Sequence, residues 1–220
     1  MKTTTLLGLA LSLAAFLPAC TVEIHTDGET VAANVAADGD DAALAPKIAT
    51  VGMRAPDFTL KGVDGESYQL SEITKSGKTV VLEWFNPDCP VSKRFHHPEN
   101  KMAALYKDFR TKDVVWLAIN SGAPGNQGHG VDRNKRAVKE YKIPFPVLID
   151  EDGKVGRMYA AKTTPHMYVI DAKGVLRFAG GIDDKKETNY VRAALTSLAA
   201  GEEVAVSGAA PYGCSVKYAR

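Results

Sequence analysis

Residues 79–93 read TVVLEWFNPDCPVSK, an apolar run that ends at a cysteine with a proline close on each side. The run 79–85 is β-branched, aromatic and nearly continuous, which is typical of a buried central strand. Pro90 suits the first position of a helix, so we predict a strand-to-helix junction at Cys89. A sulfur at a helix N-terminus lies at the positive end of the helix dipole, which favours the nucleophilic thiolate. We therefore interpret Cys89 as a reactive cysteine, although a lone cysteine is more often an inert apolar residue.

Charged residues beside Cys89 act in opposite directions. Lys93 and Arg94 lie one helical turn further on and favour the thiolate, whereas Asp88 disfavours it. The size of the net effect stays open from the sequence. Ser92 also lies close to the cysteine. Its hydroxyl could donate a hydrogen bond to the thiolate, or it could be an ordinary serine on a helix face.

The rest of the chain's body alternates strands and helices. Apolar runs predict further strands at residues 114–119, 146–149, 167–170 and 175–178. Apolar residues at helical spacing predict one helix behind Pro98, running through Met102 to Phe109, and two more at residues 134–141 and 189–198. The order βαβ, α, ββ, α predicts an α/β fold with a central mixed sheet flanked by helices on both faces.

The composition limits the class of protein. The chain has 220 residues, of which 45% are hydrophobic and 24% charged, as is typical of one globular domain with appendages. A formal net charge of +1 gives no argument for a nucleic-acid partner. Three cysteines are too few for a disulfide scaffold. The glycine-rich segment 121–130 lacks the Lys-Ser/Thr signature of a phosphate-binding loop, so we do not interpret it as a nucleotide site. We expect no cofactor and no metal site.

The N-terminus has the pattern of a secretory signal peptide over residues 1–19. A basic residue precedes an apolar run over residues 6–17, which is too short to span a bilayer. Cys20 follows Ala19 directly, which resembles a bacterial lipoprotein signal and implies that Cys20 is lipidated. The protein would then be anchored in the bacterial cell envelope, facing the periplasm or the cell exterior. Ordinary secretion and an uncleaved anchor are the alternatives.

The composition changes after the signal. Residues 20–46 contain six acidic residues and no Lys or Arg, and much of the remainder is alanine. Such a segment buries too little apolar surface to offset its ordering entropy, so we predict an acidic flexible tether, with a short helix as the alternative. The rest of the chain then divides into a domain at residues 47–205 and a C-terminal tail at residues 206–220 that carries Cys214.

Three segments of the chain resemble corresponding segments of the thioredoxin superfamily. They are the strand 80–85 followed by residues 88–92, the N-terminal segment 51–60, and the Thr-Pro pair at 164–165. Residues 51–205 as a whole are similar to the alkyl hydroperoxide reductase/thiol-specific antioxidant branch, the redoxins or peroxiredoxin-like proteins. The resemblance implies a thioredoxin-like fold with an N-terminal β-hairpin extension.

The resemblance also implies roles for individual residues. Cys89 would be the nucleophile, and Pro165 would be a cis-proline that faces its sulfur. The main chain at Thr164 would then pair with an extended substrate. Glu83 occupies the position of a buried acid that relays protons.

Two departures from the family pattern limit what this resemblance carries over. Thioredoxins have Cys-x-x-Cys, but Ser92 takes the second place here, so a disulfide within the motif is impossible. Peroxiredoxins have Pro and Thr seven and three residues before the reactive cysteine, where this chain has Leu82 and Asn86. Asn86 could still donate a hydrogen bond to a bound peroxide, although the hydroxyl expected at that place is missing.

A cysteine in the tail offers a partner for Cys89. Residues 213–218 read GCSVKY and resemble the ending of a redoxin subgroup that also has Asp-Cys-Pro and Thr-Pro-His segments, as at 88–90 and 164–166. The resemblance implies that Cys214 resolves oxidised Cys89 by closing a disulfide. An exposed tail thiol and a static structural bridge are the alternatives.

Together these expectations describe a thiol oxidoreductase that reduces hydroperoxides or exchanges disulfides through Cys89. Its partners would be a hydroperoxide or a thiol/disulfide substrate, a reducing thiol donor and the membrane through the lipid, with no nucleic acid. Two other classes stay open. One is a binding module whose cysteine traps partners as mixed disulfides. The other is copper handling in the cell envelope, with donors from Cys89, His96, His97 and Met102. The roles of His129 and His166 also stay open.

Overall fold

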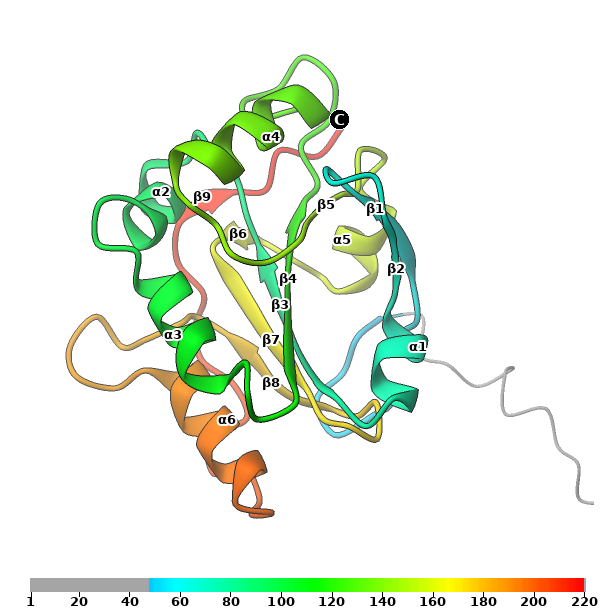
Figure 1. The fold of residues 1–220 in the computed structure, drawn as a ribbon, viewed down its shortest axis with the longest axis vertical. Coiled ribbons are helices and arrows are strands. Elements are labelled where there is room, and N and C mark those ends of the chain that lie inside the picture. Colours follow the sequence, from blue (N-terminus) through cyan, green and yellow to red (C-terminus); the bar gives the residue numbers. More distant parts are fainter. Residues whose placement is uncertain (1–47, 220) are drawn as a thin grey trace, which may run out of the picture. The chain divides into compact units, whose positions relative to one another are not determined.

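The computed structural model describes residues 48–219 (Figure 1). The expected signal peptide, the lipidated Cys20 and the acidic tether all lie outside the described residues. Within the described range, no helix is both long enough and apolar enough to cross a membrane.

Seven strands form one mixed sheet (Figure 1): β1 (Thr59–Gly62), β2 (Ser67–Gln69), β3 (Thr79–Trp84), β4 (Val114–Asn120), β5 (Val147–Ile149), β7 (His166–Ile170) and β8 (Leu176–Gly180). Their order across the sheet is β2-β1-β5-β4-β3-β7-β8. β3 runs parallel to β4 and antiparallel to β7, and β4 is parallel to β5. β1 and β2 form an antiparallel hairpin that joins the sheet at β5. The mixed sheet and its N-terminal hairpin confirm the predicted fold class.

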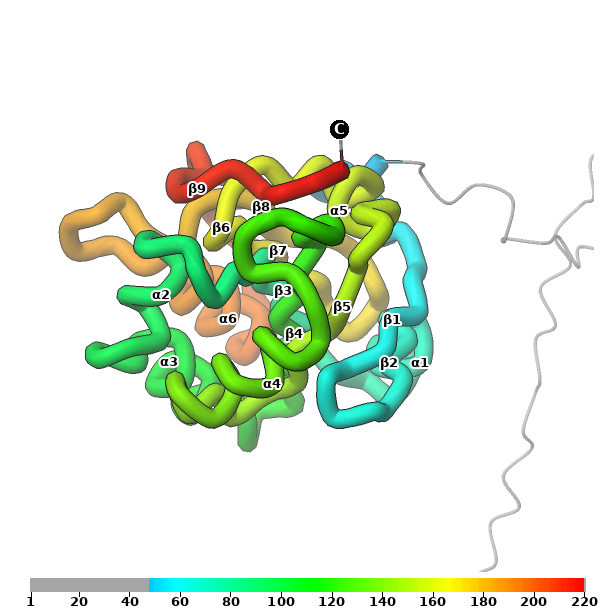
Figure 2. The backbone as a smooth tube through the Cα atoms, turned by 90° about the horizontal axis from the view of Figure 1, so that it is seen from above, coloured from blue at the N-terminus to red at the C-terminus, as the bar shows by residue number. Residues whose placement is uncertain are grey.

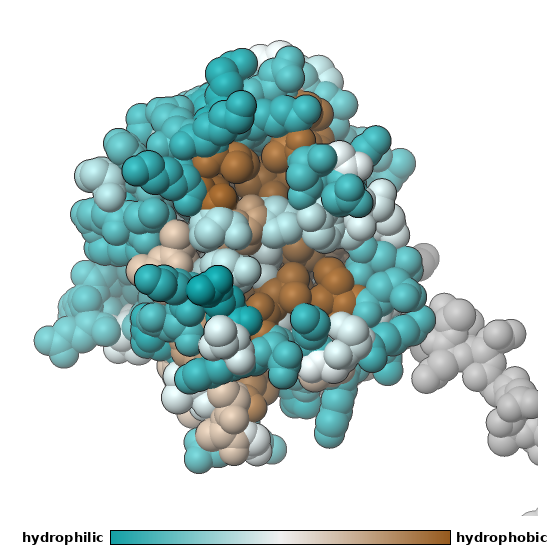
Figure 3. All heavy atoms as spheres, in the orientation of Figure 1, coloured by the Kyte–Doolittle hydropathy of each residue, from teal (hydrophilic) through white to brown (hydrophobic). Residues whose placement is uncertain are grey.

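Helices cover both faces of the sheet because alternate residues of β3 point to opposite sides. Val81 belongs to one apolar cluster and Leu82 to another. The first cluster lies under α2 (Pro90–His96), α3 (Lys101–Phe109), α4 (Val131–Glu140) and α6 (Tyr190–Ala199), and the second under α1 (Leu70–Lys75) and α5 (Lys154–Met158). Figure 2 shows the sheet between these two groups of helices. The surface in Figure 3 is mostly hydrophilic, with hydrophobic atoms gathered in hollows between the elements.

Two of the differences between the predicted and observed element boundaries have a clear structural reason. The hairpin starts only at Thr59, because residues 52–55 pair instead with the chain that leads into β8. The helix expected directly behind Pro98 begins at Lys101. His97 is extended, since the residue before a proline disfavours helical backbone, and Asn100 is left-handed with φ of 50°. Two separate helices, α2 and α3, therefore follow β3.

The C-terminal tail packs against the domain. Its residues 207–209 make backbone hydrogen bonds to Ala179 and Gly181 at the edge of β8. Further on, β9 (Cys214–Ser215) pairs antiparallel with β6 (Thr163–Thr164) in a separate two-stranded sheet. Figure 2 shows this part of the tail passing beside β6 toward α5. The tail thus brings its cysteine to the same end of the molecule as the N-terminus of α2.

Candidate active site

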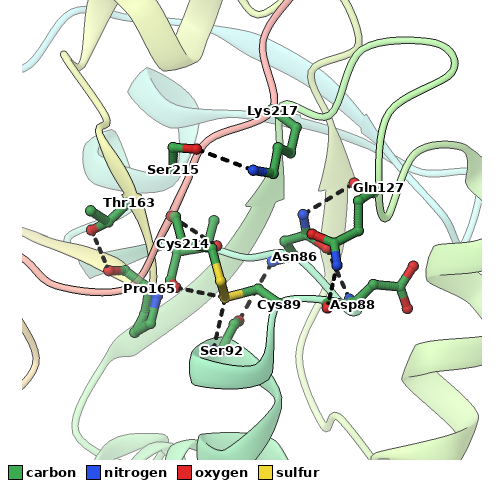
Figure 4. Close-up of a disulfide and its surroundings, with 11 residues drawn as sticks. Asn86, Asp88, Cys89, Ser92, Gln127, Thr163, Pro165, Cys214, Ser215 and Lys217 are labelled. Atoms are coloured by element: carbon green, nitrogen blue, oxygen red, sulfur yellow. Dashed lines mark hydrogen bonds between the residues drawn. A yellow bond between two sulfur atoms is a disulfide. The ribbon is translucent and has the colours of Figure 1, made fainter.

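Cys89 occupies the N-cap position of α2, as the strand-to-helix prediction requires (Figure 4). Its sulfur has no exposed surface and accepts a hydrogen bond from the backbone N–H of Ser92 at 3.4 Å. Pro90 begins the helix, where its missing N–H leaves no bond unmade. A thiolate at this sulfur would be stabilised by that N–H and by the helix terminus.

The contact from Ser92 to the sulfur is made by its backbone. Its hydroxyl oxygen instead accepts a bond from the backbone N–H of Asn86 at 3.5 Å (Figure 4). Ser92 is fully buried, so its small side chain fits against the turn before α2. Of the two alternatives for Ser92, the hydroxyl-to-sulfur bond is therefore not made in this state of the protein, and a backbone amide contacts the sulfur instead.

The Thr164–Pro165 peptide bond is cis, and this pair lies against Cys89. The sulfur of Cys89 is 3.2 Å from the carbonyl oxygen of Thr164. The hydroxyl of Thr163 donates to the carbonyl of Pro165 at 2.9 Å. Segments 75 residues apart in the chain thus form one surface around the sulfur.

Cys89 and Cys214 form a disulfide, with their Cα atoms 6.0 Å apart (Figure 4). The tail reaches this position because β9 places Cys214 opposite Thr164. Gly213 makes this approach possible: it has φ of 141°, and a Cβ there would lie 2.2 Å from the carbonyl oxygen of Thr164. The second sulfur that is absent at residue 92 is therefore supplied by the tail, and the free-thiol alternative does not hold in this state.

The tail is also anchored beyond the disulfide. The backbone N–H of Val216 donates to Lys162 at 3.1 Å, and the carbonyl of Lys217 accepts from Ala123 at 2.8 Å. The hydroxyl of Tyr218 donates to the carbonyl of Ala161 at 2.9 Å. In this disulfide-bonded state, the tail is therefore fixed beside Cys89 by these hydrogen bonds as well as by the sulfur–sulfur bond.

The side chain of Asn86 is occupied by contacts within the protein. Its Oδ1 accepts from the backbone N–H of Asp88 at 2.9 Å, and its Nδ2 donates to the carbonyl of Gln127 at 3.1 Å. Gln127 in turn donates from its side chain to the carbonyl of Asp88 at 2.7 Å. Gly128 is needed here, since a Cβ would lie 2.1 Å from Oδ1 of Asn86. Asn86 thus ties the glycine-rich loop to the turn that carries Cys89.

Two further residues that the sequence reasoning missed hold the same turn. Arg133 of α4 donates to Oδ1 of Asp88 from Nε at 2.8 Å and from Nη2 at 2.6 Å. The hydroxyl of Tyr141 donates to the carbonyl of Pro87 at 2.9 Å. Both residues are about 50 positions from the turn, and no local pattern in the sequence connects them to it.

Glu83 lies in β3 with no exposed surface. Its Oε1 is 2.7 Å from Nε2 of His96, and its Oε2 accepts from the indole N–H of Trp116 at 3.0 Å. His96 is the last residue of α2, so Glu83 lies beneath the helix that Cys89 caps. The structure thus confirms that this acid is buried, and its role as a proton relay stays a prediction.

The donors considered for copper do not converge. His96 is paired with Glu83, the ring of His97 stacks on Tyr141 with centroids 6.0 Å apart, and Met102 belongs to the apolar core. Within residues 48–219, no group of three or more His, Cys, Asp or Glu side chains is placed to hold a metal ion.

The other two histidines lie in separate environments. His166 follows Pro165, and its Nδ1 accepts from the backbone N–H of Lys162 at 3.3 Å. Burial, with a smaller effect from the charge of Lys162, lowers the pKa of His166 to about 4, so its ring is neutral near pH 7. His129 pairs with Glu151.

Curated proteins with similar sequences are named as thiol-disulfide oxidoreductases, a thioredoxin-like protein and a thiol:disulfide interchange protein. The chain is 31% identical over 124 residues to the thiol-disulfide oxidoreductase ResA of Bacillus subtilis (strain 168), covering 56% of this chain and 63% of that protein's length. It is 31% identical over 127 residues to the thioredoxin-like protein YneN of the same strain, covering 57% and 68%. It is 28% identical over 153 residues to the thiol:disulfide interchange protein DsbE of Escherichia coli (strain K12), covering 64% and 70%.

Solved structures share the fold, and a family model covers most of the domain. A hypothetical protein of Sinorhizobium meliloti 1021 superposes with a TM-score of 0.69 at 25% identity, over 77% of this chain and 95% of the other. An uncharacterized conserved protein of Geobacillus kaustophilus gives 0.68 at 30% identity, over 77% and 93%. The model of the AhpC/TSA family matches residues 51–179. The fold is therefore thioredoxin-like, and the chain belongs to the AhpC/TSA family.

Proposed function

We propose that this protein is a thiol-disulfide oxidoreductase in which Cys89 and Cys214 alternate between a dithiol and a disulfide. The observation that carries the proposal is the disulfide between Cys89, at a helix N-cap, and Cys214 of the tail. Cys214 lies in a strand that pairs with the residue before the cis-proline. The names of the relatives ResA and DsbE support the same activity. A static structural bridge would need none of this arrangement around the sulfur.

Burial and leaving-group stability assign the two sulfurs different roles. Cys89 is fully buried, whereas Cys214 is partly exposed, so a donor thiolate attacks the sulfur of Cys214. The disulfide breaks, and Cys89 leaves as a thiolate that the N–H of Ser92 stabilises. The second donor thiolate then attacks the donor sulfur of this mixed disulfide, which forms the donor disulfide and releases Cys214 as a thiolate. The donor dithiol becomes a disulfide, and two electrons pass to the protein.

The reduced protein then acts on its substrate through Cys89. Its thiolate attacks a substrate disulfide and releases one substrate thiolate. Cys214 attacks the resulting mixed disulfide at Cys89, which releases the second thiolate and restores the internal disulfide. Thr164 and Pro165 border the sulfur and would pair with an extended substrate once the tail has moved aside. Glu83, beneath α2, is proposed to take up and return the proton.

The residues around Cys89 favour disulfides over hydroperoxides as substrates. Leu82 is fully buried in the apolar core, and both polar atoms of the Asn86 side chain bond to the protein. These are the positions at which peroxiredoxins have Pro and Thr, so the side chains that would face a peroxide are missing here.

The proposal is tested by reacting the reduced protein with oxidised glutathione or with hydrogen peroxide, quenching at successive times and measuring the rate of disulfide formation. We expect faster disulfide formation with oxidised glutathione, loss of reaction in Cys89→Ser, and a stable glutathione adduct at Cys89 in Cys214→Ser. Unchanged activity in Cys89→Ser would show that the proposal is wrong. A faster reaction with peroxide would identify the protein as a peroxidase, and adducts that never turn over in the wild type would identify a trapping module.

We also propose that the protein works in the bacterial cell envelope, held by a lipid on Cys20 after removal of residues 1–19. The small residue before Cys20 and the basic and apolar segments ahead of it support this location. Mass spectrometry of the mature protein tests it: an unmodified Cys20 would contradict the lipid anchor.

A further inference from the structure

The acid beside the reactive cysteine is matched by a cation from another helix. Asp88 directly precedes Cys89, and its Oδ1 accepts two N–H bonds from Arg133, 45 residues further along the chain. The side chain of Arg133 is 20% exposed and that of Asp88 35%, so water screens this pair less than a fully exposed one.

The turn around Cys89 also has uncharged anchors. Tyr141 donates to the carbonyl of Pro87, and Gln127 donates to the carbonyl of Asp88. The ion pair adds something these bonds do not. An uncompensated Asp88 would place a negative charge next to a sulfur that must itself become an anion. Arg133 anchors Asp88 and offsets its charge at the same time.

We infer that Arg133 is a positioning residue whose charge offsets that of Asp88 at the Cys89 thiolate. The inference rests on the proposed function, in which this thiolate is the nucleophile. Among residues 48–219, Arg133 is the cation that contacts the Asp88 carboxylate. Other charged or titratable groups on the elements around Cys89 include Lys93 and Arg94 on α2, His129 on the glycine-rich loop, Glu140 at 3.7 Å from Arg133, the exposed Asp132, Lys135, Arg136 and Lys139 on α4, His166 after the cis-proline, Lys217 on the tail and the buried Glu83–His96 pair.

Two substitutions distinguish charge compensation from a purely structural role, in which the ion pair only holds the turn in place (clamping). The two roles predict shifts of the pH midpoint of Cys89 alkylation in different directions. With compensation, Arg133→Met raises the pH midpoint of Cys89 alkylation, and Asp88→Asn lowers it. Each shift is about half a pH unit or more. The double variant returns close to the wild-type midpoint. With clamping alone, both single variants move the midpoint in the same direction and the double variant resembles them, which would overturn the inference.

The assay follows one peptide in the full-length reduced protein. Iodoacetamide reacts with the thiolate over a range from about pH 5 to 9, and trypsin then releases residues 79–93, which contain only this cysteine. Thermal unfolding of each variant checks that it is folded. Alkylation needs no redox partner, so the inference can fail while the proposed function stands, and the reverse also holds.

Two controls complete the set. Arg192→Met removes a similar ion pair, at 2.7 Å from Asp108, on helices away from the sulfur, and we expect it to leave the midpoint unchanged. Arg133→Lys keeps the charge but loses the paired N–H geometry, and we expect a midpoint near that of the wild type. An unchanged midpoint in Arg133→Met, or an equal shift in Arg192→Met, would overturn the inference.

Discussion

Gly213→Ala tests how the tail holds the second sulfur. A Cβ at residue 213 would lie 2.2 Å from the carbonyl oxygen of Thr164 and 2.8 Å from its carbon. Residue 213 also has φ of 141°, a backbone conformation that residues other than glycine rarely adopt. The variant tail must therefore move away from β6, and Cys214 moves with it.

The expected size of the effect follows from two contributions. The backbone conformation costs about 1 kcal/mol for an alanine, and loosened pairing of β9 with β6 costs about 1 kcal/mol more. These costs fall on the oxidised protein, because the tail of the reduced protein is free to shift. A total of about 2 kcal/mol weakens the disulfide about 30-fold, which raises its reduction potential by about 40 mV.

Equilibration in glutathione redox buffers, followed by acid quenching and alkylation, measures this change. Gly201→Ala is the matched control, since Gly201 also has positive φ, at 73°, but a Cβ there would meet nothing within 4 Å. If Gly213→Ala and the wild type are half-oxidised in the same buffer, the tail does not constrain the disulfide as described. An equal shift in Gly201→Ala would likewise refute the reasoning.

Three further predictions concern the sulfurs and the buried polar groups. Brief exposure of the oxidised protein to glutathione should place the adduct on the peptide 193–217 with Cys214, and an adduct mainly on the peptide 79–93 would contradict the assigned roles of the sulfurs. Glu83→Ala leaves His96 and Trp116 without their acceptor, and urea unfolding should show a loss of about 3 kcal/mol, with a smaller loss in Glu83→Gln. The folded-state pKa of His166, about 4, is below its unfolded value, so the unfolded state binds more protons between about pH 4 and 6.5. Stability should therefore rise with pH through that window, by up to about 3 kcal/mol, and a His166→Phe variant with the same pH dependence would contradict this.

The sequence predicted the fold well because the signals for it are local. The run 79–85 is apolar on both faces, and β3 lies at the centre of the sheet with a cluster on each side. The proline after Cys89 indicated where α2 begins, and the structure has the helix start there. Elements that depend on short-range periodicity and on turn residues could therefore be predicted from the sequence.

The details of the site were less accessible because they depend on contacts between distant segments. Asp88 meets Arg133 and Gln127 only after α4 and the glycine-rich loop have packed against the turn. The hydrogen bonds of Asn86 depend on the path of the same loop, which the sequence does not show. From the residue type alone, Asn86 was therefore interpreted as a contact for the substrate. The partner of Cys89 was suggested by family resemblance, since a separation of 125 residues leaves no local trace.

That separation links the redox state of the protein to its conformational stability. The disulfide closes a loop that contains all the elements from α2 to α6, so it restricts the unfolded chain far more than a bridge within a Cys-x-x-Cys motif could. In the chain-entropy description, a loop of this length stabilises the folded protein by about 5 kcal/mol. By thermodynamic linkage, native packing favours closure of the disulfide to the same extent. Each reduction would then leave a domain that melts at a lower temperature than its oxidised form.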